Sequence, residues 1–256
     1  MLGPDLDILS LLPSDVSLLT AIGLVAASLI ASLITATLSL GGGILMLSIL
    51  AMIFPAAVVV PVHGTVQLGS NAGRAFLQRA HIQWHLVLWI SLGAILGSAV
   101  GGSFASLLPE NLFKLAIGLF ILFMVWVPRP DIRTHGPIAS FVGGVVISFT
   151  GMIVGVTGPL VLTFIRAIGD RHQLVGTHAV LMTFQNIAKI VAFIFYGFAF
   201  TEYVPLIIAM IITGFIGTAI GTRLLIKLPE KAFRHGFRIL ITLMALDLLR
   251  RAIFSG

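Results

Sequence analysis

Polar side chains recur at helical spacing within one apolar part of the chain. Intervals of four, four and three residues separate His63, Gln67, Asn71 and Arg74. This spacing places the four side chains along one stripe of a helix. The amide groups can donate hydrogen bonds, and the guanidinium adds positive charge. Because no acidic stripe matches it, we expect this surface to contact an anion rather than a cation.

A second apolar part carries a similar stripe, formed by His178, Gln185, Asn186 and Lys189. Ionisable groups inside a membrane are costly and usually face a cavity or one another. Lys189 has no acidic residue within twelve positions on either side, so its ammonium needs a cavity, a distant partner or a path to the surface. Two alternatives remain: each histidine is an interhelical hydrogen-bond partner, and Arg74 lies at the cytoplasmic interface.

A glycine-rich break precedes each stripe. The first break is formed by Gly41, Gly42 and Gly43, and the second contains Thr157, Gly158 and Pro159. Glycine lets the backbone leave a helix and approach a ligand closely, and proline suits the first turn of a new helix. A helix that starts at each break would present free N–H groups to an anion. We therefore predict a binding site between the two breaks. The alternative is that the glycines only permit close helix packing.

The composition is that of a membrane protein. Of 256 residues, 58% are hydrophobic and 9% are charged, whereas a soluble domain has roughly 25% charged residues. Residues 16–40 and 137–165 contain no Asp, Glu, Lys or Arg, and about 20 such residues can cross a bilayer. Short gaps carry the net charge of +6, so the charge predicts orientation in the membrane rather than nucleic-acid binding. The acidic N-terminus lacks the basic start of a signal peptide, and we expect no cleaved leader.

The second half of the chain repeats the first. An offset of 115 residues places Gly43 on Gly158, His63 on His178, Asn71 on Asn186 and Arg74 on Lys189. Further along, an offset of 120 aligns residues 97–101 with 217–221, and the Leu-Pro-Glu triplet at 108–110 with the one at 228–230. Chance matches of polar residues are rarer than matches of apolar ones, so the pattern indicates a duplication.

Charge indicates that the two copies are inverted. The gap around Arg79 is basic, whereas its equivalent near Glu202 is not. The neutral gap at Pro55 has a basic equivalent near Arg171. Because basic gaps face the cytoplasm, equivalent gaps are predicted on opposite sides of the membrane. The pair at residues 250–251, both arginines, fits this arrangement poorly.

Hydropathy predicts the membrane segments. In chain order they are 16–40, the short segment 43–54, 57–78, 83–107 and 111–127 in the first copy, and 137–156, the short segment 158–165, 174–198, 203–225 and 232–250 in the second. The short segments cannot cross a hydrocarbon core of about 30 Å. The predicted fold class is an all-α integral membrane protein with two inverted-topology repeats. About eight full spans are expected with short broken or re-entrant helices, which makes about eight to ten membrane segments.

The chain divides into four predicted regions. They are an extracytoplasmic N-terminal segment at 1–15, a first membrane repeat at 16–128, a basic cytoplasmic linker at 129–136 and a second membrane repeat at 137–256. The broken segments at matching places in the two repeats are the expected position of a transport site.

These features resemble the sulfite exporter TauE/SafE family, also called the toluene sulfonate uptake permease family. The resemblance rests on the glycine break after the first span, the duplication, the basic linker and the G-[ST]-A-[VI]-G segments followed by Leu-Pro-Glu. It implies a multi-pass protein of the bacterial inner membrane that moves sulfite, sulfonates or related organic anions. The three-glycine break is shorter than the glycine runs common in the family.

We therefore expect a secondary transporter for a small sulfur-containing anion, such as sulfite, sulfoacetate or taurine, that works by alternating access. His63 or His178 could couple transport to H⁺, and Na⁺ is the other possible coupling ion. The expected partners are the anion, the lipid bilayer and possible further copies of the chain, with no cofactor. The alternatives are an anion channel and a divalent-metal permease that uses the two histidines. The chain has no cysteine, which excludes thiolate metal sites and disulfides. It also shows no enzyme signature such as GxSxG, HExxH or GxxxxGK.

Overall fold

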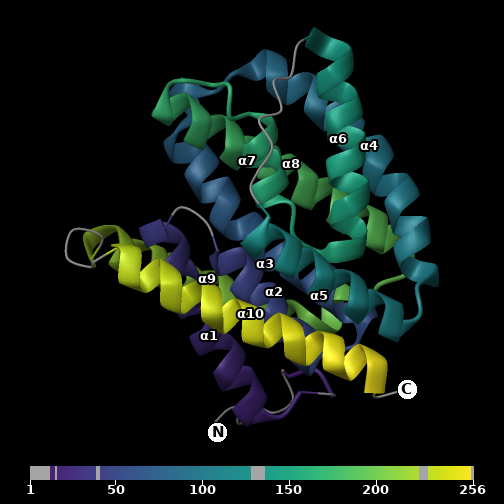
Figure 1. Ribbon diagram of the computed structural model, residues 1–256. Coiled ribbons are helices and arrows are strands. Elements are labelled where there is room, and N and C mark those ends of the chain that lie inside the picture. Colours follow the sequence, from purple (N-terminus) through teal and green to yellow (C-terminus); the bar gives the residue numbers. More distant parts are fainter. Residues whose placement is uncertain (1–11, 15, 39–40, 128–135, 225–229, 255–256) are drawn as a thin grey trace, which may run out of the picture.

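The computed structural model describes residues 12–14, 16–38, 41–127, 136–224 and 230–254, and within them every regular element is a helix (Figure 1). The first half contains α1 (Leu18–Leu38), α2 (Gly42–Ile53), α3 (Ala56–Leu77), α4 (Trp84–Leu107) and α5 (Glu110–Trp126). The second half contains α6 (Gly136–Val154), α7 (Gly158–Phe164), α8 (Arg171–Phe195), α9 (Val204–Leu224) and α10 (Glu230–Phe254). Each predicted segment corresponds to one of these helices. Most of the N-terminal segment and of the basic linker lies outside the described residues.

Five helices are long and apolar enough to cross a membrane, namely α1, α4, α6, α8 and α9. Their outer faces are apolar: Leu19 and Ile138 are each about 80% exposed, as lipid-facing side chains are expected to be. The chain is therefore a multi-pass membrane protein. α5 has 17 residues, and α3 and α10 carry charged or amide side chains, so their crossing stays a prediction. At 1.5 Å per residue, α2 and α7 are roughly 18 and 10 Å long, too short to span.

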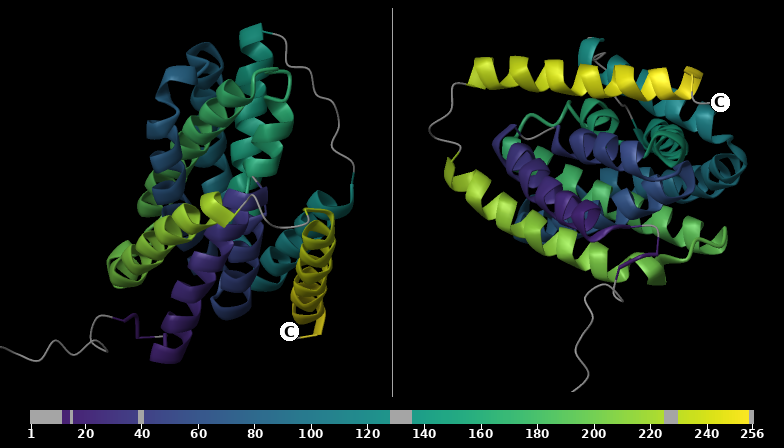
Figure 2. Two further views of the ribbon diagram at one scale, coloured as in Figure 1. Left: turned by 90° about the vertical axis from the view of Figure 1, so that its left-hand side faces the viewer. Right: turned by 90° about the horizontal axis from the view of Figure 1, so that it is seen from below.

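The first helix of each half packs on a helix of the other half, and the two contacts are equivalent. α1 packs on α9, and its equivalent α6 packs on α4, the equivalent of α9. The central contact joins α3 to α8, and α5 lies against α10. α1 runs from the N-terminal edge toward the middle, whereas α6 runs from the opposite edge toward the middle (Figures 1 and 2). A two-fold axis that reverses a membrane-spanning helix lies in the membrane plane, so this arrangement agrees with inverted copies.

Glycines bring the paired helices into backbone contact. A Cβ on Gly97 of α4 would lie 2.2 Å from the carbonyl oxygen of Val145 in α6. In the equivalent pair, a Cβ on Gly217 of α9 would lie 2.1 Å from the carbonyl oxygen of Leu29 in α1. Small residues allow helices to approach this closely in a membrane. The glycines of α4 and α9 therefore hold the two halves together.

The structure explains why the two arginines near the C-terminus fit the charge pattern poorly. Asp247 accepts a hydrogen bond of 2.7 Å from Arg250 and another of 2.7 Å from Arg251. Arg251 also donates to the carbonyl of Met52, in the last turn of α2, at 3.4 Å. Because one carboxylate pairs with both arginines, the net positive charge here is smaller than two arginines suggest, which weakens it as an indicator of the side of the membrane.

We predict that Gly97→Ala destabilises the protein by about 1–3 kcal/mol, because the added methyl group would overlap the backbone of α6. The matched control is Gly23→Ala in α1, where nothing lies within 4 Å of the new methyl group. The control should be neutral or more stable, since alanine favours a helix by about 0.5–1 kcal/mol. Thermal unfolding of both variants in detergent compares them, and equal stability would contradict the packing argument.

Candidate functional site

Both breaks use glycines whose backbone conformation other residues rarely adopt. Gly41 has φ 109° immediately before α2, and Gly155 has φ 81° just after α6. A Cβ on Gly42 would lie 1.8 Å from the carbonyl oxygen of Ala31, so α1 and α2 touch where the chain turns. Packing and backbone conformation thus both require glycine at the first break. Each break starts a short helix that does not cross the membrane.

One histidine ties each short helix to the polar helix that follows it. His63 Nε2 donates to the carbonyl oxygen of Gly43 at 2.9 Å, and His178 Nε2 donates to that of Gly158 at 3.0 Å. The two bonds occupy equivalent positions in the repeat. Both histidines therefore form the interhelical hydrogen bond that the sequence left as an alternative. Nδ1 remains as the ring nitrogen that could take a proton.

The two breaks meet at a shared cavity that leaves about 40 Å³ for water-sized molecules. About 10–15 Å³ holds one water, so the space fits a few waters or a compact anion. The first half contributes Thr35, Gly41, Gly43, Ile44, His63, Gln67, Asn71 and Arg74. The second half contributes Gly155, Val156, Gly158, Pro159, His178, Met182 and Asn186. We call this space the central cavity.

Most of the predicted site residues line the central cavity, but three lie behind its wall. Thr157 Oγ1 donates to Gln185 Oε1 at 2.8 Å, and Lys189 Nζ donates to the carbonyl oxygen of Gly155 at 2.8 Å. All three side chains are buried. They hold the second break in place rather than face the cavity. Gly42 lines an adjoining space.

Arg74 is the one cation among the residues that line the central cavity, and no Asp or Glu lines it. Its guanidinium donates to Asn71 Oδ1 at 3.0 Å, and Asn71 Nδ2 donates to the carbonyl oxygen of Gln67 at 2.8 Å. Asn186 Nδ2, on the opposite wall, is buried with no hydrogen-bond partner in the described part of the chain. The lining therefore combines positive charge with an unused amide donor.

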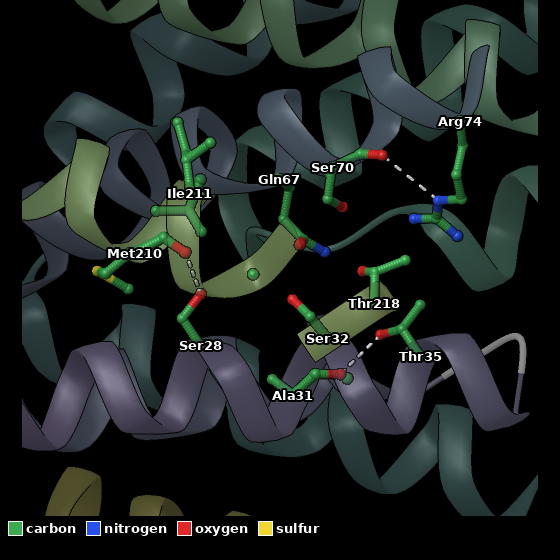
Figure 3. Close-up of a pocket in the computed structure, with 13 residues that line it drawn as sticks. Ser28, Ala31, Ser32, Thr35, Gln67, Ser70, Arg74, Met210, Ile211 and Thr218 are labelled. Atoms are coloured by element: carbon green, nitrogen blue, oxygen red, sulfur yellow. Dashed lines mark hydrogen bonds between the residues drawn. The ribbon is translucent and has the colours of Figure 1, made fainter. Parts of the chain in front are cut away.

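A second cavity adjoins the first between α1, α3 and α9 (Figure 3). Hydroxyl groups gather in it from Ser28, Ser32, Thr35, Ser70 and Thr218. Thr35, Gln67 and Arg74 line both spaces. We call it the hydroxyl cavity. Sequence reasoning missed it, although intervals of four and three residues put the first three hydroxyls on one stripe of α1.

Among the described residues, no group of three or more His, Cys, Asp or Glu could hold a metal ion. The first turn of α2, which includes the cavity-lining Gly43 and Ile44, carries the partial positive charge of a helix N-terminus, which favours an anion. α7 has only 7 residues, so we attach no such effect to it.

Comparison with known proteins gives one match. The family model described as "Sulfite exporter TauE/SafE" matches residues 24–248, which include every residue that lines the two cavities. No curated protein and no solved structure matches the chain. The match confirms the resemblance inferred from the sequence motifs.

We predict that His178→Ala destabilises the protein by about 0.5–1.5 kcal/mol, because it removes the hydrogen bond from α8 to the carbonyl of Gly158 in α7. His178→Gln should recover part of the loss, since its amide can also donate. Thermal unfolding in detergent measures both. An alanine variant as stable as the unchanged protein would remove the structural role of this histidine.

Proposed function

We propose that this chain, which belongs to the sulfite exporter TauE/SafE family, carries a small sulfur-containing anion across the bacterial inner membrane. The family is one of membrane transporters. The observation that carries the proposal is the central cavity: both halves form it, one arginine and several amides line it, and no carboxylate does.

Sulfite and sulfonates match the chemistry of this lining. Each presents three oxygen atoms that accept hydrogen bonds around a compact sulfur centre. The guanidinium of Arg74 offers a planar set of N–H donors that suits such oxyanions. Asn186 Nδ2 and Gln67 add amide donors from the two halves. No Asp or Glu is among the lining residues to repel a negative charge.

The size of the central cavity favours the anionic group over a bulky substituent. Its volume of about 40 Å³ suits sulfite or a sulfonate head group. The tail of an organosulfonate would need the hydroxyl cavity, which Arg74, Gln67 and Thr35 connect to the first space. We therefore expect short polar sulfonates such as sulfoacetate or taurine to be better substrates than toluenesulfonate.

The way the short helices are attached supports alternating access. His63 fastens α2 to α3, and His178 fastens α7 to α8, so each short helix is coupled to a long one. The two units meet where α3 packs on α8, and rocking at this contact would expose the cavity to one side and then the other. Protonation of either histidine at Nδ1 is our proposal for coupling, with Na⁺ as the other coupling ion.

Transport by purified protein in proteoliposomes tests the function directly. We predict saturable uptake of labelled sulfoacetate or sulfite, and uphill uptake when the vesicles are preloaded with the same unlabelled anion. Flux that never saturates and only follows the electrochemical gradient would identify an anion channel instead. A thermal-shift series with sulfite, sulfoacetate, taurine and toluenesulfonate ranks the ligands, and sulfate and chloride serve as controls.

Arg74→Gln should weaken anion binding at least about tenfold, since a hydrogen bond to a charged group contributes about 1.5–3 kcal/mol. The matched control is Arg79→Gln. Arg79 lies just beyond the same helix, is exposed, and contacts Phe76. Arg74→Lys should retain part of the affinity because it keeps the charge. KM for uptake and thermal shift measure the effect, and equal losses at both positions would contradict a specific role for Arg74.

A further inference from the structure

Because the chain is duplicated, the residues that line the hydroxyl cavity have equivalents in the other halves of the helix pairs. Gly217 touches Leu29 as Gly97 touches Val145, so Leu29 corresponds to Val145. Three residues further along each helix, Ser32 corresponds to Ser148. The alignment offsets also pair Thr218 with Ser98, Ser70 with Gln185 and Arg74 with Lys189. The equivalent of the space between α1, α3 and α9 therefore lies between α6, α8 and α4.

These equivalent residues differ consistently in exposure. In the first group, Ser32, Ser70, Arg74 and Thr218 are half-buried and line the hydroxyl cavity (Figure 3). In the second group, Ser148, Gln185, Lys189 and Ser98 are 3%, 2%, 3% and 2% exposed. Similar polar residues thus face a cavity in one half and are closed off in the other.

The closed group contains polar atoms that the described part of the chain leaves unsatisfied. Ser148 Oγ and Gln185 Nε2 are buried without a hydrogen-bond partner. Buried polar groups normally have partners, and each exception calls for an explanation. Water entering between α4, α6 and α8 would satisfy both atoms. A second conformation in which this wall is wet would supply the missing partners.

The two cations also differ in what they bind. Arg74 donates to Asn71 of its own helix, α3. Lys189 crosses from α8 to the carbonyl oxygen of Gly155 at the second break, and Gln185 accepts from Thr157 at the same break. Two side chains of α8 therefore bind the second break and stabilise the closed arrangement of α4, α6 and α8. Release of these bonds would free the ammonium of Lys189 to face an open space, as Arg74 does.

We propose that two equivalent routes lead to the central cavity from opposite sides of the membrane, and that this structure holds the first open and the second closed. The open route runs between α1, α3 and α9 past Arg74, and the closed route lies between α4, α6 and α8 past Lys189. The basic segment that follows α3 assigns the open route to the cytoplasmic side. The inference rests on the proposed transport function and specifies its two gates.

Single cysteines test the routes, and the chain supplies a natural background because it contains none. Ser32→Cys reports the open route and Ser148→Cys the closed one. A membrane-impermeant maleimide is applied to inside-out and right-side-out vesicles. We expect Ser32→Cys to react from the cytoplasmic side only and Ser148→Cys from the opposite side only. Ser98→Cys provides a second reporter for the closed route if the first variant does not fold.

The control is Ile216→Cys, two residues before Thr218 on the exposed face of α9. It should not react from either side, because lipid covers it. Sulfoacetate should change the labelling rates of the two routes in opposite directions, by at least about threefold, if it selects one conformation.

The outcomes separate this proposal from the transport function. Labelling of Ser148→Cys and Ser98→Cys from the same side as Ser32→Cys, or no labelling of either, overturns the two-route proposal. Labelling from opposite sides supports it, whether or not sulfoacetate acts. Opposite-side labelling that no sulfur anion alters, together with no uptake, overturns the proposed substrate and leaves the routes in place.

Discussion

A broken backbone inside a membrane must find hydrogen-bond partners within the protein, and the rest of this structure depends on that constraint. Lipid offers no donor to the carbonyl groups freed at a break. Lys189 supplies a donor to the freed carbonyl of Gly155, and His63 and His178 add donors from α3 and α8 to the first turns of the short helices, at Gly43 and Gly158. The breaks can therefore lie at the centre of the fold. These hydrogen bonds hold the short helices against α3 and α8.

This constraint divides the polar residues into two groups with different tasks. His63, His178 and Lys189 are committed to backbone carbonyls, and the two histidines also form part of the cavity lining. Arg74, Gln67 and Asn186 are left to face the central cavity. The lining is thus rich in donors because the carbonyls of Gly43, Gly155 and Gly158 are already bonded. An anion complements such a lining better than a cation does.

Much of the fold could be predicted from the sequence, because hydropathy and glycine position act locally. The short segments were expected from their length, and the histidine pair from its place in both copies. The position of Lys189 was not predictable, since its long side chain reaches back to Gly155 instead of following its stripe. The hydroxyls of Ser28, Ser32 and Thr35 lie in an uncharged, largely apolar run, so the hydropathy of this segment gives no sign of a polar surface. A duplicated sequence also implies equal halves, so it could not predict which wall would be open.

The unequal short helices break the symmetry of the two halves in energy as well as in shape. α2 has 12 residues and α7 has 7, so in the proposed two-route mechanism the units that they belong to would bury different surfaces when each gate closes. The two proposed conformations would then differ in population at rest. A difference of about 1.4 kcal/mol gives a tenfold bias between them. Such a bias lowers the apparent affinity on the side whose gate is rarely open, and it gives the empty protein a preferred face.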